Sequence, residues 1–530
     1  MLALGVFRNA LGGPFVSDDF GYLVHSPYTS ALSTENLLAI FAPWGPARIY
    51  DVGNYAPLHL LLTAIERQLF GNDVRGYHVV NVLLHALNAT LLVALLLSSR
   101  LPRLAALVCG LLFLLHPANV EAVAWISQLK TSAALALALG ALLVWPHRPA
   151  LATLLFAAGL LTKAAVVFAL PVAAALAWVR RGGPGQDRRS WVWLAGWALL
   201  LGLYALPQLE AFQQSAPLEG ETYGDPIAHL RTIAAIGMRY LVMAATGRGV
   251  SAFHDPDVPV ARFDLWWIAA IPASFLLGWR LLYTLRLRRE ESAYWLGAAS
   301  AFVPVSQIFP FVIPLADRYL YFIFPGLLGG ASFLALALGD WGAPRFGRGF
   351  ERRLSRGVAA AALALATLFG VQASVRAGIW SSEIRLYLDS ARNYPEGGTA
   401  LFLAARREAQ SGDGAAAVAL LEKAAQRGVN RFELLRSDPG LAPIRGDPAF
   451  RALVAKLALR VIERARIRGG ETQPELRMLA HAHLERDEYE QALQQLTKAL
   501  AAGGPLSEVV RRELESVRSL QRAQRSPESP

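Results

Sequence analysis

The sequence carries little charge and a single cysteine. Charged residues make up 17% of its 530 residues, and Cys109 lies inside an apolar run. One cysteine excludes an internal disulfide framework and a metal site built from cysteines. A soluble chain of this length would form several domains and would need more surface charge. In place of charge the chain has apolar side chains, which make up 54% of its residues.

The apolar residues come in long runs. A helix needs roughly 20 apolar residues to cross a bilayer core, and continuous runs exclude the alternating pattern of a membrane barrel. Buried helices of a soluble core would not account for so many runs. We therefore predict an all-α fold, with a polytopic transmembrane helical bundle of about 10–11 spans. The assigned spans are residues 77–98, 102–116, 129–146, 150–162, 164–180, 191–208, 264–285, 292–312, 319–338 and 357–377.

Positive charge is concentrated in the short connections between these runs. The net charge of +11 could suit a nucleic-acid partner, but its placement follows the rule that cytoplasmic loops are basic. We therefore expect the bilayer, and no nucleic acid, as the partner of this charge. The alternation of sides holds if residues 209–262 form one external loop. The connections assigned to the cytoplasm are residues 98–103, 146–148, 180–189, 285–289 and 345–356.

Residues 229–246 form an apolar piece inside that external loop. Arg231 and Arg239 are close on one helical face, which suits a helix lying in the membrane interface. The alternative is that this piece spans the bilayer, which would place residues 285–289 outside. The charge rule favours the interfacial position.

Residues 1–11 at the N-terminus are apolar but too short to cross a bilayer. With Arg100 and Arg103 inside, residues 17–76 must lie outside, and a chain that begins outside needs a preceding span. We expect that most of a first span precedes Met1 and that residues 5–15 form its external end.

This topology gathers ionisable residues at the external membrane surface. Such groups cost roughly 2.5–3.5 kcal/mol at a helix centre on insertion scales, so they are candidates for function. Individually, each could equally be an ordinary anchor in the headgroup zone. The set includes Asp18, Asp19, His116, Glu121, Lys130, Lys163, Asp317 and Arg318.

Asp18 and Asp19 are the most informative pair in this set. Adjacent carboxylates repel, which can raise the pKa of one of them and make it a general base for a hydroxyl acceptor. They could also bind a divalent metal, although two carboxylates are too few ligands by themselves. A third alternative is a helix N-cap followed by a first-turn acid. The pair alone leaves all three open.

Five segments carry polar motifs in a defined order, namely residues 15–19, 54–58, 77–88, 115–127 and 316–321. Together with the tail, they resemble the transmembrane and tetratricopeptide-repeat O-mannosyltransferase family, as a bacterial relative, along nearly the whole chain. The resemblance implies a GT-C glycosyltransferase fold. It also implies inverting transfer of a mannose-like sugar from a polyprenyl-phosphate carrier to a hydroxyl on the external face. The chain departs from the family near the lysines, because Gln128 and Thr131 flank Lys130 and Ala164 follows Lys163.

The implied chemistry gives each candidate residue a task. An acceptor hydroxyl is a poor nucleophile, so a carboxylate must take its proton, and we predict Asp19 for this role with Asp18 second. The leaving phosphate gains negative charge in the transition state, and an arginine can hold it with paired hydrogen bonds. We predict Arg318 as this cation, with Lys163 and Lys130 as helpers.

His116 and Glu121 lie at a turn that enters the bilayer, and we expect them to orient the acceptor or the sugar. The lipid-linked sugar is the expected donor, and no resident cofactor or metal is assigned. The alternative function is a non-catalytic membrane scaffold that presents the tail for protein assembly. We expect a bacterial plasma membrane with the tail on its external side.

The tail contains a repeat of small residues. Ala417 and Ala424 recur at the same spacing as Ala492 and Ala499. Small residues let paired helices approach closely, as in tetratricopeptide repeats of about 34 residues, which stack into a surface that can bind an acceptor peptide. We assign residues 1–378 to the GT-C-like domain, 379–396 to a connector, 397–520 to the repeat α-solenoid and 521–530 to a disordered tail.

The topology can be tested with introduced cysteines. A cysteine at Ser381 should react with a membrane-impermeant thiol reagent in intact cells, because the charge rule places it outside. A cysteine at Ser355 should stay unreacted until the membrane is opened. The reverse pattern would overturn the assignment of sides.

Overall fold

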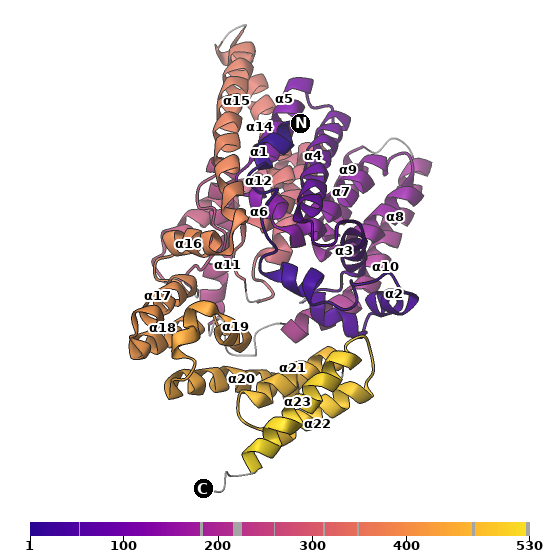
Figure 1. Cartoon of the computed structure of the whole chain (residues 1–530). Helices are drawn as coiled ribbons and strands as arrows, with labels where there is room; N and C mark the ends of the chain where they lie inside the picture. Colours follow the sequence, from indigo (N-terminus) through magenta and orange to yellow (C-terminus); the bar gives the residue numbers. More distant parts are fainter. Residues whose placement is uncertain are drawn as a thin grey trace. The chain divides into compact units, whose positions relative to one another are not determined.

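The computed structural model describes all residues except 52, 181–183, 216–224, 259, 311–312, 347–348, 469–471 and 526–530. Every element in the described part of the chain is a helix (Figure 1), which confirms the predicted all-α class. Contacts divide the chain into two compact units. Met1–Val24 and Gly53–Asp389 form the first, which we call the bundle unit. His25–Val52 and Ser390–Pro530 form the second, which we call the tail unit.

The bundle unit contains most of the apolar helices. Seven helical segments of the described chain are long and apolar enough to cross a membrane, which supports a multi-pass membrane protein. The ranges predicted as spans lie mostly on α4, α5, α7, α8, α9, α10, α12, α13, α14 and α15. Their bounds are Val74–Ser98, Arg103–Leu115, Leu129–Val144, Pro149–Leu160, Ala169–Val179, Pro184–Ser215, Leu265–Arg286, Glu291–Phe302, Asp317–Phe346 and Phe350–Ala377.

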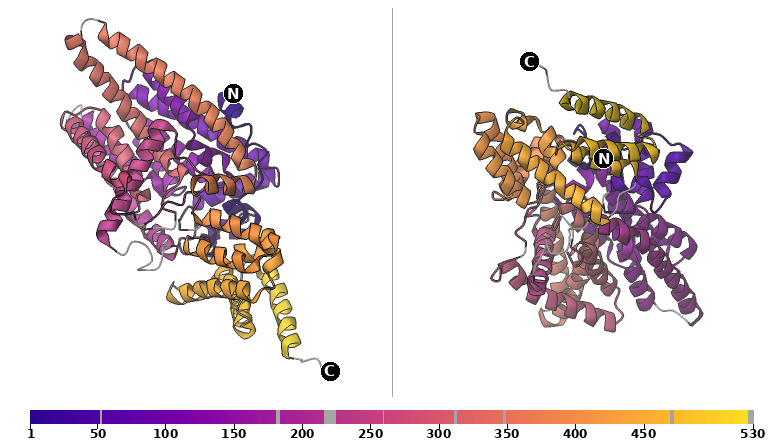
Figure 2. Two further views of the ribbon diagram at one scale, coloured as in Figure 1. Left: turned by 90° about the vertical axis from the view of Figure 1, so that its left-hand side faces the viewer. Right: turned by 90° about the horizontal axis from the view of Figure 1, so that it is seen from below.

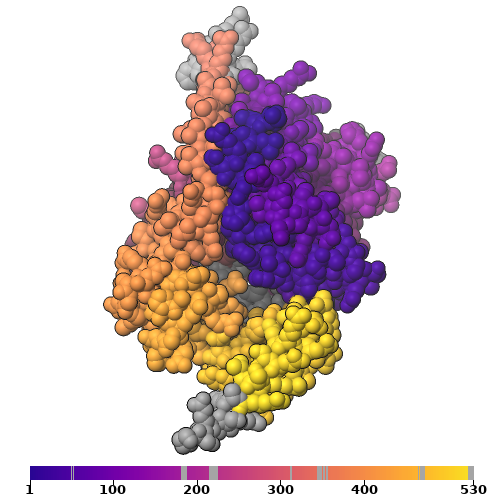
Figure 3. All heavy atoms as spheres, in the orientation of Figure 1, coloured from indigo at the N-terminus to yellow at the C-terminus, as the bar shows by residue number. Residues whose placement is uncertain are grey.

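Shorter elements and one further long helix complete this unit. α1 (Leu2–Phe7) packs against α4 and α15, and Figure 3 shows the indigo N-terminal residues against the orange α15. The remaining elements are η1 (Phe20–Val24), α3 (Pro57–Phe70), α6 (Asn119–Ala124), η3 (Ile126–Gln128), η4 (Ala164–Phe168), α11 (Pro226–Thr246), η5 (Val303–Val305), η6 (Gly378–Ser381) and α16 (Glu383–Asn393).

α11 covers the stretch for which we predicted an interfacial position. It is also one of the seven long apolar segments, so the interfacial position stays a prediction. It packs mainly against α12, another of the long apolar segments. His229 Nε2 is 2.6 Å from the Gln307 carbonyl oxygen, and the Tyr240 hydroxyl is 3.2 Å from the Ala316 carbonyl oxygen. These contacts fit an interfacial helix and a spanning helix equally.

One end of the bundle unit collects predicted cytoplasmic loops. Arg180 donates hydrogen bonds of 2.8 Å to Glu290 and 3.0 Å to the Ser99 hydroxyl, which joins three connections. Arg280 pairs with the buried Glu291 at 2.7 Å. Charges at this end of the bundle thus close loops on one another.

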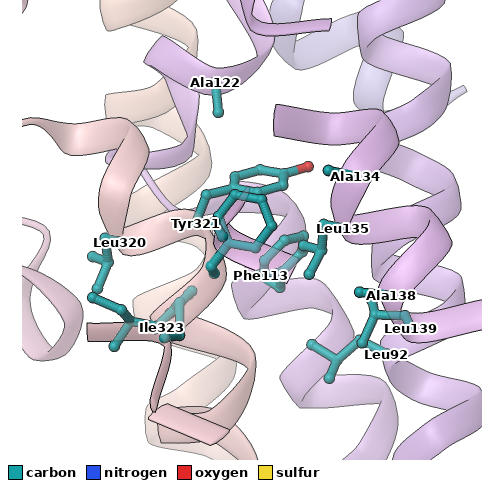
Figure 4. Packing of buried hydrophobic residues seen from close by; sticks show 14 of the residues in the cluster. Leu92, Phe113, Ala122, Ala134, Leu135, Ala138, Leu139, Leu320, Tyr321 and Ile323 are labelled. Atoms are coloured by element: carbon teal, nitrogen blue, oxygen red, sulfur yellow. The ribbon is translucent and has the colours of Figure 1, made fainter. Parts of the chain in front are cut away.

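The core between α4, α7 and α14 contains a small buried polar cluster. Asn88 Nδ2 donates to the Ser132 carbonyl at 2.8 Å and to the Tyr321 hydroxyl at 3.1 Å. His85 Nδ1 is 2.9 Å from the same hydroxyl. In Figure 4 the Tyr321 ring lies beside Phe113, and its hydroxyl points toward α7. These bonds join the three helices, while the buried Asn88 Oδ1 has no hydrogen-bond partner among the described residues, so the cluster leaves one polar atom unsatisfied.

α13 and α14 approach closely along a glycine face. A Cβ at Gly326 would lie 2.5 Å from the Ala298 nitrogen, and one at Gly329 would lie 2.2 Å from the Tyr294 ring. Only glycine permits this approach of the two backbones.

The tail unit is a set of paired helices. α17 (Gly398–Ser411) packs on α18 (Gly414–Gln426), and α21 (Gln473–Leu484) packs on α22 (Tyr489–Ala501), as the orange-to-yellow helices of Figure 2 show. The repeated alanines predicted to allow close approach, Ala417, Ala424, Ala492 and Ala499, are fully buried. The remaining helices are α19 (Phe432–Ser437), η7 (Pro439–Ile444), α20 (Pro448–Arg468) and α23 (Ser507–Arg525).

Residues 25–52 join the tail unit although they precede the bundle in sequence. They contain α2 (Thr34–Phe41) and η2 (Pro46–Asp51), and η2 contacts α21. The tail unit is therefore built from two distant stretches of chain, a pairing that was not predicted from the sequence.

Gly326→Ala tests the close packing of α13 and α14. The added methyl must displace backbone, and overpacking of this kind costs about 1–3 kcal/mol, so the thermal midpoint in detergent should fall. Gly202→Ala on α10, where a Cβ meets nothing within 4 Å, is the matched control and should leave the midpoint unchanged or raise it. Equal midpoints for the two variants would contradict this packing.

Candidate active site

The segment that joins α6 to α7 is the framework of the candidate site. The Trp125 indole donates to the Val16 carbonyl at 3.3 Å, which ties the segment to the N-terminal stretch. Asn81 Nδ2, from α4, donates to the carbonyls of Trp125 at 3.1 Å and Ile126 at 3.2 Å. The Trp125 ring also stacks on Trp380 at 5.5 Å. Elements far apart in sequence therefore fix this segment.

Asp19 is fully buried against this segment. Its Oδ1 accepts hydrogen bonds from the Ser127 backbone N–H at 2.8 Å and from the Ser127 hydroxyl, and its Oδ2 accepts from the Val16 N–H at 2.9 Å. Burial raises the pKa of Asp19 to about 7, although the hydrogen bonds from Ser127 and Val16 favour the ionised form and oppose the rise. Both oxygens are engaged, so this carboxyl group holds the chain in place.

Asp18 is the exposed member of the pair. Ser17 before it has a φ of 51°, in the left-handed region. A residue without a glycine's freedom costs about 1–3 kcal/mol there, and such strain concentrates at functional sites. The Asp18 carboxylate interacts electrostatically with both Asp19 and Arg318. The buried Asp19 carboxyl group therefore holds the turn in place, and the turn presents the Asp18 carboxylate to solvent.

Glu121 and Arg318 form a buried ion pair. The Arg318 guanidinium donates to Glu121 Oε1, and the Arg318 backbone N–H donates to Oε2 at 2.7 Å. The guanidinium also lies over the rings of Trp125, at 5.3 Å, and Tyr319, at 4.9 Å. Burial raises the pKa of Glu121, and the charge of Arg318 opposes that rise. The Arg318 side chain keeps 11% of its surface exposed.

The two predicted lysines reach the same segment from different sides. Lys130 Nζ donates to the Tyr22 hydroxyl at 2.8 Å. Lys163 Nζ donates to the Thr131 hydroxyl at 2.7 Å, and this hydroxyl donates to Gln128 at 2.6 Å. The two lysines thus contact residues three positions after Asp19 and four positions after Ser127 in the chain.

His116 lies in the core at the turn before α6. Its Nδ1 accepts from the Ala118 N–H at 3.2 Å, and its ring packs against Phe324 at 4.4 Å and Phe369 at 4.6 Å. These contacts give His116 a role in packing the turn that carries Glu121; contact with a sugar stays a prediction.

A charge network beside Arg318 was not predicted. Asp317 Oδ1 is 2.7 Å from His254 Nε2 and accepts from the Ser251 N–H at 3.2 Å. Arg376, at the C-terminal end of α15, lies 3.5 Å from Asp317 and 3.4 Å from Asp389 of α16. The network ties the loop after α11 to the start of α14. Asp317 lies in one of the polar motifs of the sequence. Its partners are dozens of residues away in the chain, so no local pattern predicted these contacts.

Metal ligands are not grouped at this site. Among the residues that the structure describes, no cluster of three or more His, Cys, Asp or Glu side chains could hold a metal ion. The described groups that interact with the Asp pair are therefore hydrogen-bond donors and a nearby guanidinium.

Comparison with known proteins finds a partial relative. Over 127 residues, or 23% of this chain, the sequence is 38% identical to the Protein O-mannosyl-transferase Tmtc1 of Drosophila melanogaster. The matched stretch spans 15% of the length of that relative. No family model matches the chain. No solved structure matches it either.

Glu121→Gln should destabilise the bundle unit. The change leaves the Arg318 charge buried without its partner, and breaking a buried pair on one side costs about 3–5 kcal/mol. Thermal unfolding in detergent should show a lower midpoint for this variant. Glu383→Gln, at an exposed carboxylate on α16, should change the midpoint little.

Combining Glu121→Gln with Arg318→Gln isolates the pair. The double variant should lose less stability than the sum of the single variants, because neither charge is then stranded. Additive losses would contradict the ion pair.

Proposed function

We propose that the chain is a membrane glycosyltransferase that moves a mannose-like sugar from a polyprenyl-phosphate carrier to a hydroxyl of an acceptor on the external membrane face. The partial similarity to an O-mannosyl-transferase and the seven apolar segments support this class. The proposal is carried by the exposed Asp18, whose carboxylate interacts electrostatically with Arg318 of the Arg318–Glu121 pair. A base for the acceptor and a cation for the leaving phosphate are the two groups this reaction needs.

In the proposed reaction Asp18 takes the proton of the acceptor hydroxyl. The oxygen forms a bond to the anomeric carbon of the sugar as the bond from that carbon to the phosphate oxygen breaks. The electron pair of the broken bond leaves with the lipid phosphate, and the proton ends on the Asp18 carboxyl. Attack opposite the leaving group inverts the anomeric centre.

The geometry leads us to place Asp18 before Asp19 as the base, the reverse of the order expected from sequence. Three donors occupy both Asp19 oxygens, and its side chain is fully enclosed. Asp18 is exposed on the same turn. Asp19 then acts as a positioning residue, which fixes the strained Ser17 turn and aims its neighbour.

Arg318 is suited to receive the leaving phosphate. Glu121 and the two aromatic rings hold the guanidinium in one orientation before any donor arrives, so little reorganisation is needed in the reaction. A guanidinium offers several N–H donors in a plane, and the partial exposure leaves an approach for a phosphate oxygen. Lys130 and Lys163, at the adjoining segment, add positive charge to the same region.

Replacing each aspartate in turn by asparagine separates the role of Asp18 as the proposed base from that of Asp19 as a positioning residue. Asp18→Asn should lower turnover by about 10²–10⁴-fold while donor binding changes little, because the amide cannot take a proton. Asp19→Asn places an amide NH₂ against N–H donors, so it should lower thermal stability as well as activity. The assay is sugar transfer from a synthetic polyprenyl-phosphate donor in nanodiscs.

Asp73→Asn is the matched control for this assay. Asp73 caps α4 through a 3.1 Å bond from the Arg75 N–H, and asparagine caps equally well, so activity should stay unchanged. Full activity of Asp18→Asn would refute the base. Loss of wild-type activity in chelator, restored by a divalent cation, would make the aspartates metal ligands instead.

A tail deletion tests whether the repeats recruit a protein acceptor. Without residues 397–530 the bundle should still insert, because each apolar helix satisfies its own backbone hydrogen bonds. Transfer to protein acceptors should fall, while transfer to a short hydroxyl-bearing peptide at high concentration should persist. Unchanged modification of protein acceptors would remove the recruiting role from the tail.

A further inference from the structure

The chain turns from α15 into α16 through η6, and the side chains at this turn are not used in the proposed reaction. Arg376 lies in the last turn of α15, Trp380 in η6 and Asp389 on α16. We call these three residues the α15–α16 corner. All three belong to the bundle unit, and the tail unit resumes at the next residue, Ser390. α16 is therefore the helix through which the chain passes from the bundle unit into the tail unit.

The ionic part of the α15–α16 corner reaches the start of α14. The Arg376 guanidinium lies between two carboxylates, 3.5 Å from Asp317 Oδ2 and 3.4 Å from Asp389 Oδ2. These side chains are largely enclosed, with 11% of Arg376, 1% of Asp317 and 15% of Asp389 exposed. The two acids also accept hydrogen bonds from the consecutive backbone N–H groups of residues 251–252, at 3.2 and 2.8 Å. One arginine and one loop therefore join α14 to α16.

The aromatic part of the corner reaches Arg318 by a separate route. The buried Trp380 ring stacks on the Trp125 ring, with the two centroids 5.5 Å apart and the planes at 24°. The Arg318 guanidinium lies over that same Trp125 ring at 5.3 Å. The N-terminal stretch approaches the corner closely as well, because a Cβ at Gly13 would lie 2.6 Å from the Trp380 carbonyl oxygen. Trp125 therefore contacts both the corner and the guanidinium.

The backbone that carries Arg318 is anchored on both sides of Asp317. The Tyr240 hydroxyl is 3.2 Å from both the backbone nitrogen and the carbonyl oxygen of Ala316. On the other side, the Arg318 N–H donates to Glu121 at 2.7 Å. Asp317 lies between these two anchored residues, and its side chain is the one that the corner holds. Because packed interiors transmit strain, a displacement of the corner acts on Arg318 or breaks one of these contacts.

We propose that Arg376, Trp380 and Asp389 are positioning residues for Arg318, so that the placement of α16 within the bundle unit sets how firmly Arg318 binds a phosphate. A cation stabilises a leaving phosphate best when it is held in place beforehand. The task of Arg318 toward phosphate rests on the proposed function, whereas the coupling rests on the contacts of the corner. Because coupling between two sites is reciprocal, phosphate bound at Arg318 also holds α16 in place.

Hydrogen–deuterium exchange of the full-length protein in nanodiscs tests the coupling without any ligand. Asp389→Asn keeps an oxygen for the backbone N–H but loses the charge that holds Arg376, so the amides of residues 316–320 should exchange faster. Exchange of residues 287–291, at the end with the predicted cytoplasmic loops, should stay unchanged, which separates local loosening from general destabilisation. Glu383→Gln, at an exposed acid on the same helix, is the matched control. Unchanged exchange of residues 316–320 in Asp389→Asn would overturn the proposal.

A synthetic polyprenyl monophosphate without a sugar is the probe for the second measurement. Asp389→Asn should weaken its binding about fivefold or more, at the lower end of the usual coupling between sites, while Glu383→Gln should bind it as the wild type does. In an Asp317→Asn background, Asp389→Asn should have little further effect, because both changes act on one contact.

Two results of the binding measurement would contradict the proposal. Unchanged binding in Asp389→Asn would show that the corner does not set the phosphate affinity of Arg318. Independent losses in the Asp317→Asn and Asp389→Asn variants would show that the corner does not act through Asp317. A wild type that fails to bind the probe would instead refute the proposed donor, and the exchange comparison would then decide on the corner alone.

Discussion

The buried carboxyl group of Asp19 is the constraint on which the candidate site depends. It joins the N-terminal stretch, through Val16, to the segment between α6 and α7, through Ser127. That segment carries Trp125, over which the Arg318 guanidinium lies. The buried Asp19 therefore sets the position of the exposed Asp18 beside it. The segment that holds Asp19 also carries the ring on which the Arg318 guanidinium lies. Since burial raises the pKa of Asp19 to about 7, the hydrogen bonds are what keep such a group inside the protein.

The charged side chains of the bundle unit make different kinds of contact at its two ends. At the end with the basic loops, Arg180 pairs with Glu290 and Arg280 pairs with Glu291, and these contacts close connections. At the other end, Glu121 holds Arg318 against aromatic rings, and the neighbouring Asp317 network secures the backbone that leads into α14. A buried charge is costly unless it is paired and hydrogen-bonded, and Glu121 and Asp317 meet this condition through Arg318 and His254.

The sequence predicted the elements of this fold better than their partners. Apolar runs have a length set by the bilayer, so α4 and α14 could be placed from composition alone. The spacing of small residues likewise indicated the buried Ala417 and Ala492 of the tail. Long-range pairing has no such signature. The inclusion of residues 25–52 in the tail unit and the contact of His254 with Asp317 depend on side chains that meet only after folding.

The candidate residues show the same limit. Composition and motif order identified both aspartates, yet which one is buried is decided by Ser127, a residue more than a hundred positions away. His116 had the chemistry of a site residue, but the rings of Phe324 and Phe369 enclose it. Residue type and order thus selected the candidate residues, while their burial and exposure, on which the proposed roles rest, became visible only in the folded structure.

The most direct measurement of the central claim is an experimental structure of the protein in nanodiscs with a non-hydrolysable polyprenyl-phosphate sugar analogue bound. The account predicts the phosphate within hydrogen-bond distance of the Arg318 guanidinium and the anomeric carbon facing the Asp18 carboxylate, with space for a hydroxyl between them. Asp19 should remain bonded to Ser127 in that complex. A phosphate bound away from Arg318, or a sugar that faces neither aspartate, would contradict the account.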